Sequence, residues 1–229
     1  MKDLQHMLND IEKEVRLTRH LIGKDALDSR VMAAIKQVPR HEFLPDNYRF
    51  LAYDNGPAPI DCGQTISQPY IVALMTDLLH TRATDTILEI GTGSGYQAAV
   101  LSNLVKQVYS LEIIGELATQ ARQRLKQLGY GNVTVRHGNG HFGWPEQAPF
   151  DGIIVTAAAP FIPPALIEQL RTGARLVIPV GLPYRYQELL VIEKKADGEI
   201  KARTIFGVSF VPLTGGGATE TNPITGEQP

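Results

Sequence analysis

Two short segments of this chain combine residue types that could bind a cofactor and act on a substrate. Residues 63–69 read Gly-Gln-Thr-Ile-Ser-Gln-Pro and form a polar stretch between glycine and proline. Residues 87–96 form an apolar run that breaks into alternating glycines at Gly91, Gly93 and Gly95. Glycine lets the backbone turn sharply and lets a ligand approach it closely. We therefore expect the second segment to bind a cofactor and the first to determine how it is used.

The residues around the glycines predict a nucleotide-binding element. Residues 86–90 are mostly β-branched and apolar, as expected for a strand buried in a parallel sheet. Residues 96–105 read as the helix that follows the turn. The spacing is Gly-x-Gly-x-Gly and not the Gly-x-Gly-x-x-Gly that cradles a pyrophosphate. This spacing favours a cofactor without a diphosphate.

An acidic residue ends the next predicted strand, which covers residues 107–111. This residue, Glu112, lies about 20 positions after the glycine turn, where a carboxylate can accept hydrogen bonds from both hydroxyls of a ribose. A carboxylate that only favours the start of the following helix is the alternative interpretation. The glycines upstream favour the ribose role.

Together these segments resemble the class I S-adenosylmethionine-dependent methyltransferases, and more closely the protein-L-isoaspartate (D-aspartate) O-methyltransferase family. The resemblance extends from about Val31 to Thr214, and the Gln-Thr-Ile-Ser-Gln-Pro segment is highly specific. The residues that carry it are Val38–Phe43, Ala52–Tyr53, Pro59–Ile60, Gly63–Ala73, Glu89–Tyr96, Ala148–Asp151, Thr156–Pro160 and Pro179–Gly181.

The resemblance implies that S-adenosylmethionine donates a methyl group to the free carboxylate of L-isoaspartyl and D-aspartyl residues in damaged proteins and peptides. The ester then closes to a succinimide, which allows partial return to aspartate. Ser67 becomes the active-site residue, with a hydroxyl that contacts the substrate carboxylate. The expected cofactor-binding residues are Thr65, Ile66, Glu89, Gly91, Thr92, Gly93, Ser94, Gly95, Glu112, Asn139 and Gly140.

The chemistry expected at Ser67 needs no strong base. A carboxylate is already ionised at neutral pH, so the enzyme must exclude water and hold one oxygen in line with the methyl group. The Ser67 hydroxyl and the backbone N–H groups near a helix start could hold it. A nucleophilic serine is disfavoured because the Gly-x-Ser-x-Gly elbow is missing. A helix N-cap is the structural alternative for Ser67.

Several candidate residues keep two interpretations. Glu89 either reaches the methionine end of the cofactor or braces the glycine loop. The family usually has Asp at position 139, so Asn139 is expected to keep an adenine contact without the charge. Arg40 and His41 either bind a peptide backbone or support a turn. The single cysteine, Cys62, excludes an intrachain disulfide and is interpreted as a bystander or packed thiol.

Composition limits the class of protein. The net charge of -2 and the pI near 6.3 give no general attraction to nucleic acid. The histidines show no metal-ligand spacing, and we expect no metal site. No apolar run approaches the ~20 residues that span a bilayer, and the N-terminus lacks a signal-peptide pattern. We expect a soluble, cytoplasmic monomer whose partners are isoaspartyl-containing proteins and peptides.

The predicted elements give an α/β fold. It is a Rossmann-like, doubly wound, seven-stranded and mostly parallel sheet with helices on both faces and an N-terminal helical extension. Residues 1–80 form the extension that carries the substrate loop, 81–214 the methyltransferase core, and 215–229 a disordered tail. The turn at Asp197-Gly198 predicts a hairpin, and the resemblance implies that the last strand is inserted antiparallel. Strands are expected at 86–90, 107–111, 132–136, 151–156, 174–180, 187–194 and 201–207, and helices at 4–21, 30–37, 70–79, 95–104, 114–128 and 163–171.

Two functions of other classes stay open at this point. A nicotinamide-dependent dehydrogenase could use the same sheet, although the glycine spacing opposes it. A binding module that has lost turnover is the second; intact Ser67 and the glycines oppose it, and Asn139 is the residue that favours it. Within the methyltransferases, an enzyme acting on another carboxyl group or on a small molecule is a further alternative.

Overall fold

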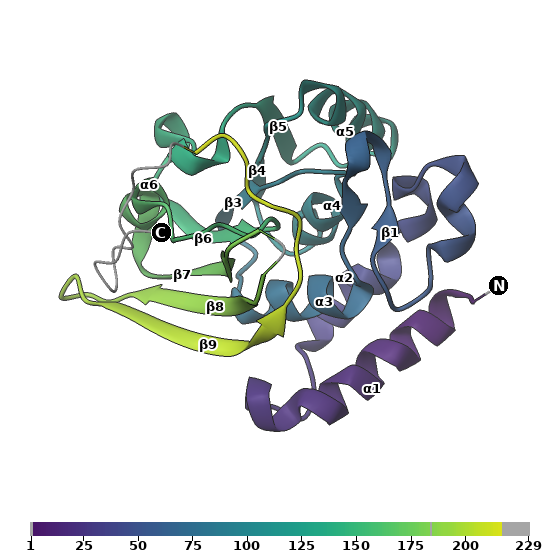
Figure 1. The fold of residues 1–229 in the computed structure, drawn as a ribbon, viewed down its shortest axis with the longest axis horizontal. Coiled ribbons are helices and arrows are strands. Elements are labelled where there is room, and N and C mark those ends of the chain that lie inside the picture. Colours follow the sequence, from purple (N-terminus) through teal and green to yellow (C-terminus); the bar gives the residue numbers. More distant parts are fainter. Residues whose placement is uncertain (1, 184, 217–229) are drawn as a thin grey trace.

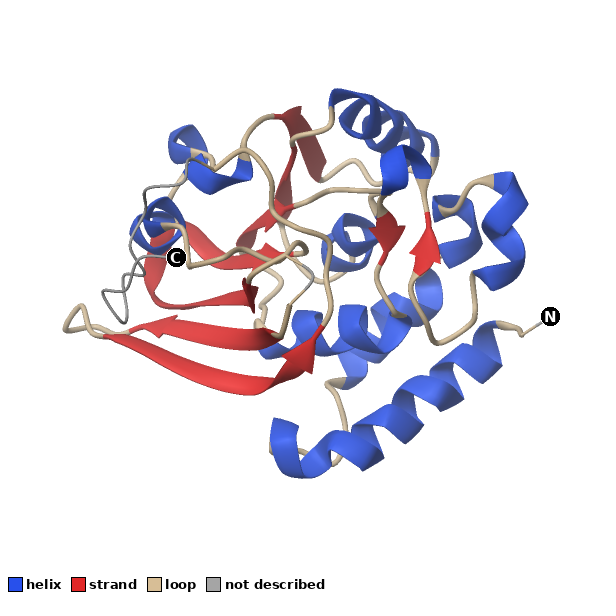
Figure 2. Ribbon diagram, viewed as in Figure 1, coloured by secondary structure: helices blue, strands red, loops and turns tan. Residues whose placement is uncertain are grey.

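A seven-stranded sheet forms the centre of the computed structural model, which describes residues 2–183 and 185–216 (Figures 1 and 2). In spatial order the strands are β5 (Val133–His137), β4 (Gln107–Glu112), β3 (Thr86–Ile90), β6 (Phe150–Val155), β7 (Leu170–Gly181), β8 (Gln187–Lys194) and β9 (Ile200–Val208). The first five pair in parallel, and β8 is antiparallel to both of its neighbours. The expected mostly parallel seven-stranded α/β fold is confirmed.

The position of the antiparallel strand differs from the prediction. The antiparallel strand is β8, the sixth strand of the sheet along the chain, so the expected insertion of the last strand is wrong. A tight turn at Asp197 and Gly198, where Gly198 has a φ of 86°, joins β8 to β9. A connection this short makes consecutive strands neighbours, so β9 pairs with β8 at the sheet edge.

Helices cover both faces of the sheet, as predicted. They are α1 (Leu4–Ile22), α2 (Ser29–Gln37), α3 (Pro69–Leu78), α4 (Tyr96–Ser102), α5 (Gly115–Gln127) and α6 (Pro164–Gln169). The first five contribute buried side chains to one hydrophobic core, and α6 contributes to a second core on the other face. In Figure 1 the long helix α1 lies outside α2 and α3, at the edge of the molecule.

The strands divide their side chains between the two cores by simple alternation. On β3, Ile87 packs in the core beneath α3 and α4, whereas Leu88 and Ile90 pack in the core beneath α6. On β6, Ile154 faces the first core and Ile153 the second. Because successive strand residues point to opposite faces, a strand buried on both sides is mostly apolar. This explains the mostly apolar runs that predicted the parallel strands.

One predicted boundary needs correction. Strand β7 begins at Leu170, inside the helix expected over 163–171, because Leu170 already pairs with Phe150 across a register shift. The helix α2 is capped by Asp28, whose side chain accepts a hydrogen bond from the Arg30 backbone N–H. Two 3-10 helices, Arg40–Phe43 and Asp46–Leu51, follow α2.

The segment before the sheet also contains a small hairpin that precedes α3. Strands β1 (Ala58–Pro59) and β2 (Thr65–Ile66) pair antiparallel, separate from the large sheet. Most of the predicted tail, residues 217–229, lies outside the described residues. Within the described ranges, no helix is long and apolar enough to cross a membrane.

Candidate active site

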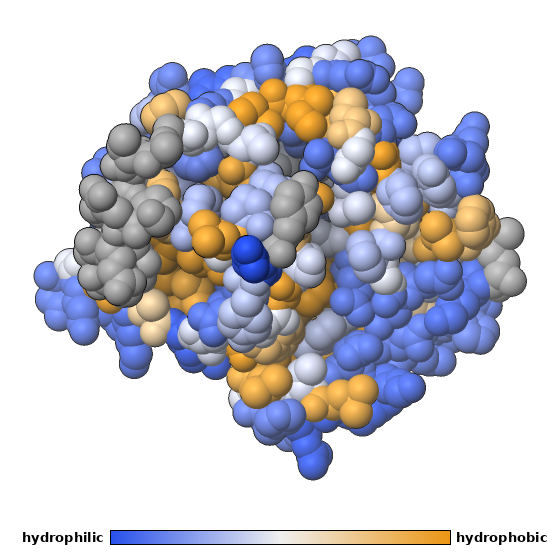
Figure 3. All heavy atoms as spheres, in the orientation of Figure 1, coloured by the Kyte–Doolittle hydropathy of each residue, from blue (hydrophilic) through white to orange (hydrophobic). Residues whose placement is uncertain are grey.

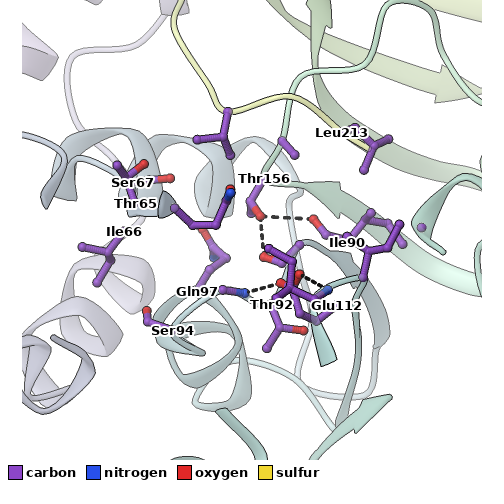
Figure 4. A pocket seen from close by; sticks show the side chains of 18 of the residues that line it. Thr65, Ile66, Ser67, Ile90, Thr92, Ser94, Gln97, Glu112, Thr156 and Leu213 are labelled. Carbon is purple, nitrogen blue, oxygen red and sulfur yellow. Dashed lines mark hydrogen bonds between the residues drawn. The ribbon is translucent and has the colours of Figure 1, made fainter. Parts of the chain in front are cut away.

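A cavity opens where β3, β4 and β6 end, beside the β1–β2 hairpin and α3. In Figure 4, Thr65 and Ser67 lie on one side of it, Ile90 and Leu213 lie on the other, and Thr156 lies between them. We call it the cofactor cavity. Its lining residues are Gln64–Ser67, Val72, Ile90–Ser94, Tyr96, Gln97, Leu111–Ile114, Gly140, Thr156, Ala157 and Val211–Thr214.

The glycine loop makes the sharp turn that its sequence predicted. Gly91, Gly93 and Gly95 have φ angles of 94°, 52° and 90°, a region that other residues rarely adopt. A Cβ atom on Gly91 would lie 2.6 Å from Oγ1 of Thr156. That hydroxyl donates to the Gly91 carbonyl over 2.6 Å. The loop therefore lies tight against β6, and glycine is required for the fit.

Glu112 lies in the wall of the cofactor cavity with its carboxylate fixed by the backbone. One oxygen accepts a hydrogen bond from the Gly93 N–H at 2.7 Å, and the other accepts from the Ile114 N–H at 3.0 Å. The side chain is largely buried. The carboxylate thus braces the glycine loop and the start of α5, and it stays where a ribose would approach. The ribose role of Glu112 and its role at the start of the following helix are therefore compatible.

Glu89 lies beneath the glycine loop and not in the cavity wall. Its Oε2 accepts a hydrogen bond from the Ser110 hydroxyl at 2.5 Å, and Ser110 in turn contacts the Thr92 hydroxyl at 2.5 Å. Oε1 is buried without a partner in the described chain. Burial raises the pKa of Glu89 to about 8, so the carboxyl is mostly neutral at pH 7. The geometry favours the loop-bracing interpretation over direct contact with the cofactor.

Asn139 uses both ends of its amide within the protein. Its oxygen accepts from the His141 N–H at 3.0 Å, which caps the 3-10 helix Gly140–Phe142, and its Nδ2 donates to the Gly215 carbonyl at 2.5 Å. Gly140 lines the cofactor cavity, whereas Asn139 and Gly95 do not. Each end of the Asn139 amide is therefore engaged once, and an adenine contact would have to use its second N–H or the second lone pair of its oxygen.

A second cavity adjoins the first, and we call it the substrate cavity. It encloses about 600 Å³, within the range of small-molecule sites. Thr65, Ser67, Thr156 and Val211 line both cavities, so these residues form a common wall. The remaining lining residues are Glu14, Thr18, Pro57, Gln68, Tyr70, Ile71, Tyr186 and Phe206–Phe210. In Figure 3 hydrophobic residues gather in the hollow of this face, whereas α1 presents a mainly hydrophilic surface.

Ser67 connects the β1–β2 hairpin to α3 and is half-buried. The N-cap of α3 is Gln68, so the N-cap interpretation of Ser67 is wrong. Among the described residues the Ser67 hydroxyl has no hydrogen-bond partner, whereas the Ser67 carbonyl accepts from Arg40 at 2.7 Å. Arg40 is fully buried, which favours the interpretation that it supports a turn over the one in which it binds a peptide backbone. Residues 64–68, which we call the Ser67 loop, are thus anchored through their backbone, and the Ser67 hydroxyl stays available.

The walls of the two cavities carry few charges. Their described lining residues include no histidine, lysine or arginine, and the carboxylates are Glu112 and Glu14. No group of three or more His, Cys, Asp or Glu side chains in the described ranges could hold a metal ion. Cys62 is exposed and lines neither cavity. The described walls can orient a group that is already reactive, and they contain no histidine or lysine that could act as a base.

Sequence reasoning missed several lining residues. Gln97 and Thr156 are polar side chains with no motif of their own, although Thr156 stands in a segment that carried the resemblance. The segment Val211–Thr214 reaches the cavity from the far end of the chain. Two hydrogen bonds hold it to Ala158, one donated by the Ala158 N–H to Val211 and one donated by the Leu213 N–H to Ala158.

The cavity suits S-adenosylmethionine by its own residues. The glycine turn exposes backbone at the end of β3, and the Glu112 carboxylate lies beside it at the end of β4. Backbone without Cβ atoms suits a closely approaching ligand, and a carboxylate suits two ribose hydroxyls. The residues present therefore fit this cofactor.

Comparisons with known proteins agree with this geometry. The family model of protein-L-isoaspartate (D-aspartate) O-methyltransferase matches residues 12–218. A relative from Nitrosococcus oceani, protein-L-isoaspartate O-methyltransferase 2, is 62% identical over 215 residues, which cover 94% of this chain and 98% of that protein.

Two solved structures share the fold. One, a protein-L-isoaspartate O-methyltransferase, has a TM-score of 0.80 and 26% identity, and the match covers 93% of this chain and 66% of the other. The second is a putative protein-L-isoaspartate O-methyltransferase from Plasmodium falciparum in complex with S-adenosyl-L-homocysteine, with a TM-score of 0.72 and 25% identity over 90% and 97% of the two chains. The chain belongs to the protein-L-isoaspartate (D-aspartate) O-methyltransferase family of S-adenosylmethionine-dependent enzymes.

Proposed function

We propose that the two adjoining cavities divide the family's reaction between them. The cofactor cavity holds S-adenosylmethionine, and the substrate cavity holds the peptide segment that contains the isoaspartyl or D-aspartyl residue. The observation that carries this proposal is the common wall, because Ser67 and Thr156 line both cavities. A group bound beside Ser67 would then lie next to the methyl donor.

The residues of the glycine loop would hold the cofactor. In the proposal Gly91, Thr92, Gly93 and Ser94 supply its backbone contacts, Glu112 accepts from the ribose hydroxyls, and Thr65, Ile66 and Gly140 complete the wall. Glu89 acts from beneath, through Ser110 and Thr92, by keeping the loop in place. When bound, the cofactor supplies a methyl group made electrophilic by a sulfonium.

Ser67 would hold the free carboxylate of the damaged residue. In isoaspartate the main chain continues through the side-chain carbon, which leaves the α-carboxylate free. That carboxylate is ionised at neutral pH, so it would accept the methyl group without a base, its new C–O bond replacing the C–S bond of the cofactor with no proton transferred. Ser67 and the N–H groups of its loop need only orient one carboxylate oxygen and exclude water.

The substrate cavity also suits an extended peptide. Phe206–Val211, at the end of the edge strand β9, forms one side of it, and Tyr70 and Ile71 of α3 form another. We propose that flanking residues of the substrate pack on these apolar side chains. We also propose that the protein works as a monomer in the cytoplasm, on isoaspartyl proteins and peptides as its partners.

Methyl transfer to a matched pair of peptides tests the function directly. One peptide carries isoaspartate at a single position, and its twin carries normal aspartate there. The purified protein with S-adenosylmethionine should methylate the isoaspartyl peptide and not the twin, and the product should be a base-labile ester that releases methanol. Equal labelling of the twins, or labelling of neither, would contradict the proposal.

A further inference from the structure

Arg40 is a charged residue buried completely in the interior of the protein, behind the Ser67 loop. It opens the 3-10 helix Arg40–Phe43, and its side chain is 0% exposed. Arginine stays charged at neutral pH even here, since burial lowers the pKa of Arg40 only to about 10. A full positive charge therefore lies inside the fold and lines neither cavity.

The surroundings of Arg40 compensate this charge only in part. Nη2 donates to the carbonyl of Ser67 at 2.7 Å, whereas Nε and Nη1 are buried without a partner in the described chain. The guanidinium carbon lies 4.7 Å from the centroid of the Tyr96 ring, a cation–π contact. Among the described residues no carboxylate forms an ion pair with Arg40, and nearby Glu42 pairs with His41 and Arg49. A buried charge in this state is costly unless something compensates it.

The cavity walls create the opposite requirement. A substrate carboxylate beside Ser67 would bring a negative charge to walls whose described charged groups are Glu14 and Glu112. Among the described residues no cation lies in those walls. The Arg40 guanidinium, which donates to the Ser67 carbonyl, has no counterion among the described residues. Charges in a low-dielectric interior interact over longer distances than charges in water.

We propose that Arg40 is a positioning residue that fixes the Ser67 carbonyl and whose buried charge selects an anionic substrate at the Ser67 loop over the neutral ester that the reaction produces. This inference rests on the proposed function of the Ser67 loop. Methylation removes the negative charge of the substrate, so the attraction ends when the C–O bond has formed. The same residue thus favours binding of the acid and release of the ester.

The start of α3 is the competing source of positive potential, because Pro69 follows the Ser67 loop directly. Replacing Arg40 leaves α3 intact and therefore separates the two sources. Arg40→Met removes the charge and keeps a long unbranched side chain. Arg40→Lys keeps the charge but loses the planar guanidinium and its fixed set of N–H donors. Arg49→Met removes an exposed arginine from the same region and controls for net charge.

The measurement is binding of two peptides to enzyme saturated with S-adenosylhomocysteine, whose thioether lacks the positive sulfonium of the methyl donor. One peptide carries isoaspartate with its free carboxylate, and the twin carries a carboxamide at that group. The wild-type protein and Arg49→Met should bind the acid at least about tenfold more tightly than the amide. Arg40→Met should lower this ratio about fivefold or more, and Arg40→Lys should keep most of it while lowering kcat.

Native melting and an unchanged affinity for S-adenosylhomocysteine identify folded variants, and Arg40→Gln replaces Arg40→Met if the latter does not fold. A wild-type ratio near one overturns the proposal, as does a folded, neutral variant that keeps the wild-type ratio. An equal loss in Arg49→Met would also overturn it, because net charge alone would then explain the effect. Methyl transfer by the wild-type protein is scored separately, so a failure of the proposed function is distinguishable from a failure of this inference.

Discussion

The glycine loop and the Ser67 loop face the same cavity, but different parts of the chain hold them in place. The glycine loop is fixed by the sheet itself, through Glu112 of β4 and Thr156 beyond β6. The Ser67 loop is fixed from outside the sheet, by Arg40 and by Gln68, whose amide donates to the Asn55 carbonyl at 3.1 Å. The sheet therefore supports the cofactor half, and the N-terminal extension supports the half that we assign to the substrate.

This difference shows how a common sheet can serve one particular reaction. A glycine turn at the end of the first parallel strand is a general device for nucleotide-like ligands. The Ser67 loop depends on contacts within the N-terminal extension, which lies before the sheet in the chain. Substitutions in the first region should affect cofactor binding, and substitutions in the second should affect turnover.

The largest effect is expected from Gly91→Val in the cofactor half. The new side chain would clash with Thr156, and the backbone at φ 94° would be strained. Affinity for S-adenosylmethionine should fall more than about 100-fold, since each 1.4 kcal/mol of lost binding energy is tenfold. Calorimetric titration measures the affinity directly.

Gly129→Val is the matched control for this substitution. Gly129 has a similar φ of 85°, and a Cβ atom placed there would have no other atom within 4 Å, so strain alone should leave the affinity unchanged. Equal losses in both variants would mean that the tight fit between Gly91 and Thr156 is irrelevant to cofactor binding.

Glu112→Gln should give a smaller loss in the same half. The amide keeps one oxygen for a backbone N–H but loses the charge and one acceptor, so affinity should drop about 10- to 100-fold. Glu116→Gln, on the exposed face of α5, is the control and should bind normally. Unchanged affinity in Glu112→Gln would remove the ribose role and leave Glu112 as a structural brace.

Glu89 makes stability depend on pH. The pKa of its carboxyl is raised from 4.5 to about 8 by burial, so the folded state keeps the proton longer than the unfolded state does. The favourable contribution of the Glu89 carboxyl to the free energy of unfolding is fully present below pH 4.5. It is lost as the pH rises through about 8. Glu89→Gln removes this titration.

The wild-type protein and Glu89→Gln should therefore have similar free energies of unfolding near pH 4.5. Near pH 8 the variant should be more stable, by an amount on the order of a few kcal/mol. Urea unfolding at both values measures the difference. A difference between variant and wild type that does not change with pH would show that Glu89 is ionised in the folded state.

The smallest effects are expected at two Asn-Gly sequences, where the backbone amide of glycine attacks the asparagine side chain and generates isoaspartate. Asn139 is held at both ends of its amide, whereas Asn55 has a 3.2 Å bond to Glu14 and a buried oxygen without a partner in the described chain. During prolonged warm incubation both sites should gain mass by deamidation, with Asn55 reacting faster. Peptide mapping measures each rate, and faster reaction at Asn139 would contradict the structural ranking.

Sequence patterns could predict the cofactor half because its parts are local. The apolar run, the glycine spacing and the acid after the next strand are each read from a few neighbouring residues, and the sheet brings them together by a general rule. The same patterns left Glu89 with two interpretations. Only its contact with Ser110, on the neighbouring strand, shows that it lies beneath the loop.

The substrate half depends on contacts between distant residues. Arg40 reaches the Ser67 carbonyl across 27 positions, and no periodicity indicates that this arginine is buried. Likewise Val211–Thr214 closes the cavity by pairing with Ala158, which no local motif predicts. The predicted position of the last strand was wrong because it rested on the family resemblance, which implied that this strand is inserted antiparallel into the sheet. The short connection between β8 and β9 instead places β9 at the sheet edge, beside β8.

Ser67→Ala tests the division between the two halves most directly. The substitution removes one hydroxyl that has no partner in the described protein, so fold and cofactor affinity should survive. With the isoaspartyl peptide, kcat should fall about 100-fold or more, comparable to the loss of one positioned hydrogen-bond donor. Affinity for S-adenosylmethionine, measured on the same preparation, should stay within about threefold of wild type, or less than about 1 kcal/mol. Unchanged turnover, or a parallel loss of cofactor binding, would contradict the account.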